Sequence, residues 1–246
     1  MKKTFVQRVG GALRPLGFLS FTQLPSFLAY RRGRGPRETA FRVKRVPHPM
    51  ICRARTTDAV TLESVFAGKH HLPPAPLKAG AVILDLGANA GYAAAHFASL
   101  YPSARILAVE LDSGNAELAR RNLAPFRNVE VIQAGVWIED GEITYGGEEA
   151  DAFAIGETGK QSAPALRIET ILDRRGIVMA DYVKMDIEGA EWPMFQAAAW
   201  LDRIGSISVE IHRREWFEPI RKTLEAHGFQ SASSTSHWSS ISGIRR

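Results

Sequence analysis

The sequence contains a single cysteine, Cys52, among 246 residues. This scarcity excludes a framework of disulfide bonds, and a lone thiol is typical of proteins in a reducing compartment, most simply the cytoplasm. No internal repeat is present either. With 45% hydrophobic and 23% charged residues, the composition is that of an ordinary globular protein rather than a collagen-like or disordered one.

The chain has no hydrophobic run long enough to cross a bilayer as a helix. An apolar stretch over residues 15–30 is interrupted by Gln23 and Pro25, whereas a spanning helix needs about 20 predominantly apolar residues. Arg31 and Arg32 follow where the small residues of a signal-peptide cleavage site belong, so a secretory signal is also disfavoured.

Acidic residues are almost absent from the first 46 positions. Eleven lysines and arginines stand there against one acid, Glu38, so this segment carries a charge of +10 and the remaining residues carry −5. We therefore expect a basic N-terminal extension over residues 1–54 and a folded domain over residues 55–246. No nucleic-acid-binding motif accompanies the basic residues, so nucleic acid is not an expected partner.

Two interpretations of the extension remain open. In the first, its apolar side chains pack on the main domain; these are Phe18, Phe21, Leu24, Phe27 and Leu28. In the second, residues 1–46 make a peripheral contact with an anionic membrane, with apolar side chains among the headgroups and arginines on the lipid phosphates. The expected location is accordingly cytoplasmic, with or without membrane association.

Strand-like and helix-like segments alternate after residue 80. Strands are expected at residues 81–86, 105–110, 129–133, 182–186 and 206–211, and helices at residues 92–100, 115–123, 190–200 and 216–227. Residues 140–160 suggest an irregular excursion or a hairpin. The alternation predicts right-handed crossovers and an α/β fold with a doubly wound, mainly parallel sheet. Ligands of such sheets bind at the carboxyl ends of the strands.

The turn after the first of these strands, residues 85–91, lacks the middle glycine of the dinucleotide motif G-x-G-x-x-G. Asn89 stands at that position, and Gly91 comes one residue too early to be the third glycine. Since the middle glycine admits a pyrophosphate against the backbone, NAD and FAD are disfavoured. Gly87 and Gly91 still let the backbone take positive φ and approach a ligand closely.

Glu110 ends the second strand, 23 residues after Gly87. A carboxylate there can accept hydrogen bonds from the vicinal hydroxyls of a ribose. A cofactor with a ribose but without a pyrophosphate is therefore expected, and S-adenosyl-L-methionine fits. The alternative is a solvent-exposed glutamate at a strand end with no ligand.

Three acids follow the fourth strand: Asp186, Glu188 and Glu191. Stabilisation of the next helix through its dipole is one explanation for them. Asp186 lies nearest the expected cleft and shares a strand face with Lys184, because side chains alternate with a period of two. Lys184 needs a carboxylate partner, for which Asp85 and Glu210 are the candidates.

The fifth strand ends with Glu210 and His212 on one face. Imidazole has the ordinary pKa best suited to removing a proton near neutral pH. We therefore expect His212 as the first and Asp186 as the second candidate for a catalytic base. The alternative for His212 is a surface imidazole at a strand end.

Four segments together carry a family resemblance: DLGANAGY at 85–92, AVELD at 108–112, ETILD at 169–173 and VKMDIEGAE at 183–191. They resemble the FkbM family of S-adenosylmethionine-dependent methyltransferases. The resemblance extends over roughly residues 55–230, with its core at about 81–230. It implies the seven-stranded Rossmann-like sheet of class I methyltransferases, with a reversed last hairpin near residues 228–244.

The resemblance also implies a cofactor site. The residues around the methionine part would be Asp85, Gly87, Asn89 and Gly91, with Glu110 at the ribose. Asp186 would lie between cofactor and acceptor. The segment after the third strand, residues 133–135, lacks the acid that many class I enzymes place near adenine. Ala134 would then be the residue of this segment that lies at the adenine side of the cofactor.

The implied reaction is O-methylation of a small-molecule or glycan hydroxyl, on a sugar or a polyketide-like compound. In a less favoured variant, Asp186 and Glu210 hold a Mg²⁺ ion; no metal ligand is otherwise expected. Two further alternatives are a non-catalytic membrane- or polyanion-binding module that retains the fold, and, more remotely, a nicotinamide-dependent oxidoreductase.

Overall fold

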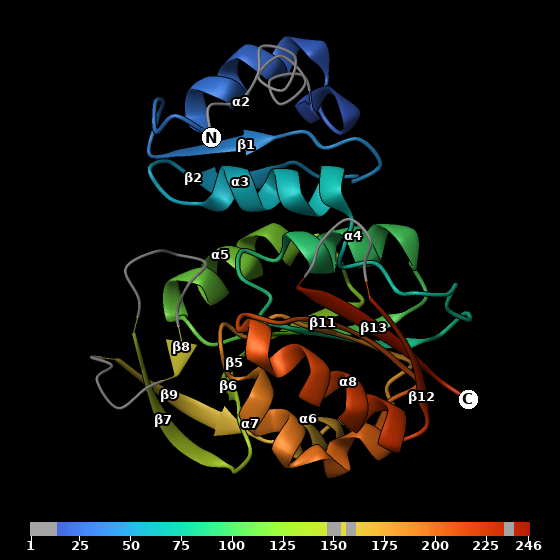
Figure 1. Cartoon of the computed structure of the whole chain (residues 1–246). Coiled ribbons are helices and arrows are strands. Elements are labelled where there is room, and N and C mark those ends of the chain that lie inside the picture. The colour runs from blue at the N-terminus through green and yellow to red at the C-terminus, as the bar shows by residue number, and fades with distance from the viewer. Residues whose placement is uncertain (1–13, 147–153, 156–160, 234–238) are drawn as a thin grey trace. The chain divides into compact units, whose positions relative to one another are not determined.

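The computed structural model describes residues 14–146, 154–155, 161–233 and 239–246. The chain forms two compact units, residues 1–70 and residues 71–246. The division expected from the sequence, after residue 54, falls inside the first unit. Each unit has its own sheet structure (Figure 1).

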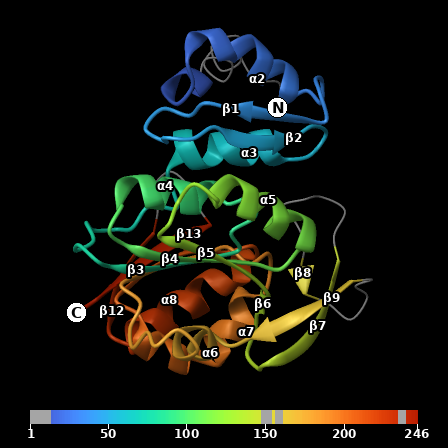
Figure 2. The ribbon, with the colours of Figure 1, turned by 180° about the vertical axis from the view of Figure 1, so that it is seen from behind.

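Unit 1 is built around a short antiparallel strand pair. The strands are β1 (Glu38–Phe41) and β2 (Met50–Arg53), with Thr39 opposite Cys52. Helix α2 (Leu24–Tyr30) lies on one side of the pair and α3 (Asp58–Glu63) on the other (Figures 1 and 2). Three short helical turns complete the unit: η1 (Arg14–Gly17), η2 (Phe21–Gln23) and the π-helical η3 (Ser64–Gly68).

Aromatic side chains give unit 1 a core of its own. Phe27 packs edge-on against Phe18 and Phe41, with ring centroids 5.6 and 5.1 Å apart. The Tyr30 hydroxyl donates a hydrogen bond to the Cys52 carbonyl at 2.8 Å. Of the five apolar side chains named in the first interpretation of the extension, Phe18, Leu24 and Phe27 are buried, Leu28 is half-buried and Phe21 is 77% exposed, so that interpretation does not apply to Phe21.

Unit 2 contains a seven-stranded sheet in the order β12-β13-β11-β10-β3-β4-β5. The strands are β3 (Val82–Leu86), β4 (Arg105–Glu110), β5 (Val129–Gln133), β10 (Tyr182–Met185), β11 (Ser206–Glu210), β12 (Phe229–Ser233) and β13 (Ser240–Arg245). The five strands from β11 to β5 are parallel, whereas β13 runs antiparallel to both of its neighbours. The predicted fold class, including the reversed last hairpin, is confirmed.

Helices cover both faces of this sheet. Helices α4 (Tyr92–Leu100) and α5 (Ser113–Leu123) lie on one face, and α6 (Ile168–Asp173), α7 (Glu191–Gln196) and α8 (Phe217–Ala226) on the other (Figures 1 and 2). Two 3-10 turns, η4 (Ala198–Arg203) and η5 (Arg214–Trp216), join the second group. Three consecutive buried alanines let α4 pack closely on the sheet.

The expected continuous helix over residues 190–200 is wrong. The backbone leaves the helical region at Ala197, with φ −104° and ψ 52°, where α7 gives way to η4. The Trp200 indole N–H donates to the Met194 carbonyl at 2.9 Å. This bond satisfies a carbonyl in the last turn of α7, so the helix can end while the large indole is buried.

Unit 2 contains a second, four-stranded sheet in the order β6-β9-β7-β8. Its strands are β6 (Gly135–Val136), β7 (Gly141–Gly146), β8 (Ala154–Ile155) and β9 (Gln161–Leu166). The antiparallel pairing of β7 with β8 confirms the hairpin alternative for the described part of residues 140–160. Residues 147–153 and 156–160 lie outside the described residues. No helix in the described part of the chain has the length and apolarity to cross a bilayer.

Candidate functional site

The turn after β3 is a tight loop with three left-handed residues. Gly87, Asn89 and Gly91 have φ of 76°, 50° and 82°. The N–H groups of Gly87 and Ala88 donate to the Val109 carbonyl at 3.0 and 2.9 Å, which anchors the loop on β4. A Cβ on Gly87 would lie 1.7 Å from the Asp186 carbonyl oxygen, so only glycine fits here. Gly91 caps the start of α4.

Glu110 lies beside this loop at the carboxyl end of β4. Its side chain accepts hydrogen bonds from the N–H of Asn89 at 2.7 Å and of Asp112 at 2.9 Å. The Ala134 N–H donates to the Glu110 backbone carbonyl at 3.0 Å. With an exposed fraction of only 6%, Glu110 is buried, and the alternative of a solvent-exposed glutamate is wrong. Burial raises its pKa to about 7, against the opposing effect of the two N–H groups.

Lys184 connects the glycine loop with the end of β10. Its ammonium donates to the Gly87 carbonyl at 2.7 Å and lies 3.3 Å from Asp85 Oδ1 and 3.4 Å from Asp186 Oδ2. The expected pairing with Asp85 is confirmed, and Glu210 also attracts the charge of Lys184. Burial raises the pKa of Asp85, and Lys184 opposes this shift. Burial lowers the pKa of Lys184, but the two aspartates outweigh it and the net shift is upward.

Carboxylates face both ring nitrogens of His212. Nδ1 lies 2.8 Å from Glu191 Oε1, and Nε2 lies 3.2 Å from Glu188 Oε2 and 3.6 Å from Asp186 Oδ1. The His212 side chain is 26% exposed, whereas that of Glu191 is wholly buried. Burial alone lowers the pKa of His212, but its hydrogen bonds to Glu188 and Glu191 outweigh burial and raise the pKa to about 11.

The residues expected at the site are joined in one chain of contacts. The contacts run from His212 through Asp186 and Lys184 to Asp85 and Gly87. The glycine loop then connects through Asn89 to Glu110 and on to Ala134.

The sequence interpretation did not foresee the contacts that Glu188 and Glu191 make with His212. Their only sequence signal was their position after the fourth strand, beside the expected cleft. Glu191 has the position that the dipole explanation requires, in the first turn of α7, and its side chain accepts from the Gly189 N–H at 3.1 Å. Asp186, Glu188 and His212 each offer one donor atom to a group in which these atoms lie within 4.8 Å of one another.

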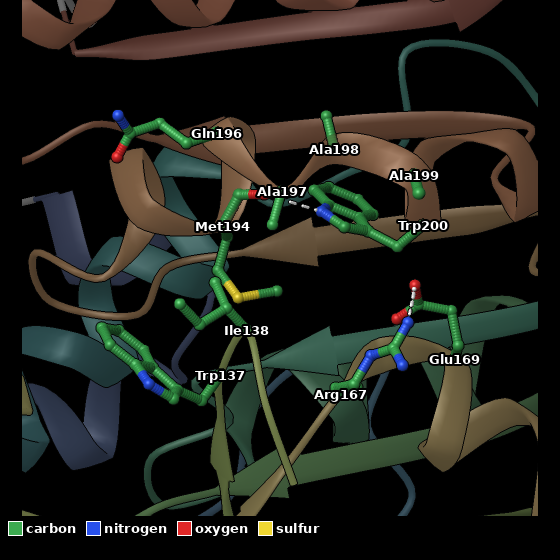
Figure 3. Close-up of a pocket in the computed structure, with 10 residues that line it drawn as sticks. All are labelled: Trp137, Ile138, Arg167, Glu169, Met194, Gln196, Ala197, Ala198, Ala199 and Trp200. Atoms are coloured by element: carbon green, nitrogen blue, oxygen red, sulfur yellow. Dashed lines mark hydrogen bonds and ion pairs between the residues drawn. The ribbon is translucent and has the colours of Figure 1, made fainter.

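A separate pocket of about 360 Å³ lies between α7, η4 and the start of α6. Figure 3 shows Trp137, Ile138 and Met194 on one side of it and the ion pair of Arg167 with Glu169 on the other. Among the described residues that line it are none of those expected to bind the cofactor or to catalyse. Its lining is mainly apolar.

Comparison with known proteins gives a family match. The model of the methyltransferase FkbM domain matches residues 85–231, which includes the glycine loop, Glu110, Asp186 and His212. No curated protein matches the chain.

Several solved structures are similar in fold. Precorrin-6y C5,15-methyltransferase from Geobacter metallireducens is 18% identical, with a TM-score of 0.45 over 76% of this chain and 87% of that chain. The fibrillarin pre-rRNA processing protein of Methanococcus jannaschii is 16% identical, with a TM-score of 0.47 over 85% and 82% of the two chains. Fibrillarin from Aeropyrum pernix, in complex with natively bound S-adenosyl-L-methionine, is 16% identical, with a TM-score of 0.45 over 84% and 81%.

Proposed function

The chain belongs to the methyltransferase FkbM family, and on that premise we propose that it methylates a hydroxyl oxygen of a sugar, a glycan or a polyketide-like small molecule. It is a methyltransferase that depends on S-adenosyl-L-methionine. When bound, this cofactor supplies an electrophilic methyl group on a sulfonium. The hydroxyl acceptor, the residue roles and the mechanism below are our proposal.

We propose that Glu110 accepts hydrogen bonds from the ribose hydroxyls of the cofactor. The buried carboxylate at the end of β4 is the observation that carries the cofactor site. Each of its oxygens already accepts one backbone N–H, and an ionised carboxylate has about four acceptor positions, so two remain for a diol. The backbone N–H groups also fix the carboxylate in place, which reduces the cost of ordering it on binding.

The glycine loop is proposed to hold the methionine part of the cofactor. Asp85, Gly87, Asn89 and Gly91 surround this position, and Ala134 is proposed to lie at the adenine side. Lys184 pairs with Asp85, which opposes the effect of burial on the pKa of that carboxyl, and it donates to the Gly87 carbonyl. The loop residues thereby orient their polar groups before the cofactor arrives, and such preorganisation favours in-line attack.

Proton removal from the acceptor is proposed to fall to the pair of Asp186 and His212. A sugar hydroxyl must lose its proton on methylation, and a positioned base contributes typically 10²–10⁴-fold to the rate. Both nitrogens of His212 already face carboxylates. We therefore place Asp186 first as the proton acceptor, and His212 as the group that orients its carboxylate from 3.6 Å.

We further propose that unit 1 contacts anionic membranes. Phe21 is 77% exposed, and the arginines and lysines from Arg31 to Arg45 are all exposed. The Leu19–Val43 bridge brings Arg42 and Lys44 beside the segment that leads to Phe21. An apolar side chain with basic neighbours is the arrangement that binds at a lipid headgroup boundary.

Transfer of a labelled methyl group into fractionated cell extract tests the proposed reaction. The purified full chain is incubated with methyl-labelled S-adenosylmethionine and each fraction, and the labelled product is identified by mass spectrometry. An ether-linked methyl group on a small molecule or glycan is expected. Label on nitrogen, on carbon or on RNA would contradict the proposal, while Asp186→Asn should lower the rate of genuine transfer by about 10²–10⁴-fold.

A further inference from the structure

Three side chains from two segments of the chain direct donor atoms toward one point. Asp186 and Glu188 follow β10, and His212 follows β11. His212 Nε2 lies 3.2 Å from Glu188 Oε2 and 3.6 Å from Asp186 Oδ1. Around a metal ion with bonds of about 2.1 Å, neighbouring ligand atoms are roughly 3.0–3.4 Å apart. Small side-chain rotations would therefore bring all three atoms to bonding distance.

The position of the imidazole is fixed from behind. His212 Nδ1 lies 2.8 Å from Oε1 of Glu191, a carboxylate that is itself wholly buried. Histidines that bind metals generally donate the nitrogen that does not ligate to a carboxylate or carbonyl, which sets the tautomer and orients the ring. Glu191 holds His212 in this way, with Nε2 turned toward Asp186 and Glu188.

The local charge also favours a bound cation. Three carboxylates, of Asp186, Glu188 and Glu191, surround the imidazole, and Lys184 lies 3.4 Å from the Asp186 carboxylate. Lys184 already pairs with Asp85 as well as Asp186. A divalent cation among the three donor atoms would take the place of the proton that these carboxylates favour on His212 and would offset their negative charge.

We propose that Asp186, Glu188 and His212 bind one divalent ion of a first-row transition metal, such as Mn²⁺, with Glu191 orienting the histidine. An imidazole ligand beside two carboxylates favours such an ion over Mg²⁺ or Ca²⁺, which prefer oxygen ligands alone. We propose this site in preference to the Asp186–Glu210 variant considered from the sequence, because the donor atoms of Asp186, Glu188 and His212 lie within 4.8 Å of one another. Three protein ligands leave open positions for water or for an acceptor oxygen. Metal binding does not depend on the proposed reaction, but its use in activating an acceptor hydroxyl rests on it.

Titration of Mn²⁺ into the full chain, freed of metal with EDTA and then dialysed, tests the site. Free Mn²⁺ is followed by electron paramagnetic resonance. One bound ion per chain is expected, with affinity at least about tenfold higher than for Mg²⁺ measured by competition. Glu188→Gln should lower the affinity at least about tenfold, and Glu191→Gln about 10- to 100-fold, the usual effect of removing a partner of a ligating histidine.

Glu215→Gln is the matched control, since Glu215 is exposed and lies three residues after His212. The affinity of this variant for Mn²⁺ should equal that of the unchanged chain. Circular dichroism checks each variant's fold, and bound Mn²⁺ should raise the thermal midpoint of the unchanged chain. Absence of binding at millimolar Mn²⁺, or equal affinity in Glu188→Gln, overturns the proposal. S-adenosylhomocysteine binding in EDTA, measured by calorimetry, reports separately on the cofactor site, so failure of the metal site and of the proposed function can be told apart.

Discussion

Glu110 is both buried and hydrogen-bonded to the backbone on either side of the proposed ribose position. Glu110→Ala removes two hydrogen bonds to a charged acceptor, worth roughly 1.5–3 kcal/mol each before water compensates. Cofactor affinity should therefore fall by about one to three orders of magnitude. Calorimetry with S-adenosylhomocysteine measures this fall. Glu117→Ala, on the exposed surface of α5, is the control, and unchanged affinity in Glu110→Ala would refute the ribose assignment.

The same side chain should make stability depend on pH. Its pKa is about 7 in the folded chain, against an ordinary value of 4.5. Between these values the folded state keeps a proton that the unfolded state releases, so this group lowers the free energy of unfolding as pH rises, by up to ~3 kcal/mol. Glu110→Gln has no such titration. Urea unfolding at pH 5 and pH 8 should show the unchanged chain losing stability relative to Glu110→Gln; parallel curves would contradict the buried carboxylate.

Lys184 and Lys78 each form an ion pair with an aspartate, but only the pair of Lys184 is buried, so the two lysines allow a comparison of a buried with an exposed ion pair. Lys184→Met leaves the wholly buried Asp85 without its cation, and breaking a buried pair in this way costs typically about 3–5 kcal/mol. The Lys78 side chain is 73% exposed in its pair with Asp181, so Lys78→Met should cost about 0–1 kcal/mol. Chemical denaturation compares the two. Equal losses would show that burial does not strengthen the Lys184 pair.

The sequence predicted some of these contacts because they follow from strand geometry. The period of two placed Lys184 and Asp186 on one face, and adjacent parallel strands brought Asp85 beside Lys184. The carboxylates around His212 could not be predicted in this way. One of them, Glu188, takes a left-handed backbone conformation with φ 49° in the turn before α7, and local sequence does not specify that conformation for a glutamate.

Among the turns, Gly87 and Gly176 both have a left-handed backbone, but only Gly87 lies close against another segment of backbone. Replacing each by alanine therefore separates the cost of the backbone conformation from the cost of a steric clash. Both have positive φ, of 76° and 62°, but a Cβ at Gly176 meets nothing within 4 Å. Gly176→Ala should therefore cost only the left-handed penalty of roughly 1–2 kcal/mol. Gly87→Ala adds a clash with the Asp186 carbonyl. This variant should therefore unfold at a clearly lower denaturant concentration than Gly176→Ala and should bind S-adenosylhomocysteine more weakly than the unchanged chain. Similar stability in the two variants would contradict the close approach.

Strands were predicted better than helix ends and excursions. The buried apolar runs of the five parallel strands are visible in the sequence, as is the glycine after α8. The end of α7 was not, because it depends on Trp200 reaching back to the Met194 carbonyl, a tertiary contact. Similarly, β7 and β9 have alternating burial in a small sheet of their own, and the glycine- and glutamate-rich composition of residues 140–160 obscured that pattern.

For the whole molecule, we predict salt-sensitive binding to anionic vesicles through unit 1. Each basic residue near such a surface contributes about 1 kcal/mol, and added salt screens the attraction. The double variant Phe21→Ser with Arg42→Gln should sediment less with phosphatidylserine vesicles than the unchanged chain. Neutral phosphatidylcholine vesicles are the control. Equal sedimentation with both lipids, or no effect of the double variant, would contradict a membrane contact.

Composition revealed the charge of the first unit but not its fold. The excess of arginine pointed to an extension, whereas residues 14–70 bury an aromatic cluster around Phe27 and carry their own strand pair. Short strands of four residues give little periodic signal. Phe18 is buried whereas Phe21, only three residues later, is exposed, because the short helical turn η2 changes the direction of the chain. No sequence pattern predicts that turn.

The absence of a side chain at Gly87 lets the backbone after β3 touch the backbone after β10. Replacing the segment after β10 with that of a homologue, for example to change the substrate range, would disturb this contact. The turn after β3 would have to be replaced together with it. The two segments must therefore be exchanged together in such a design, although about a hundred residues of chain separate them.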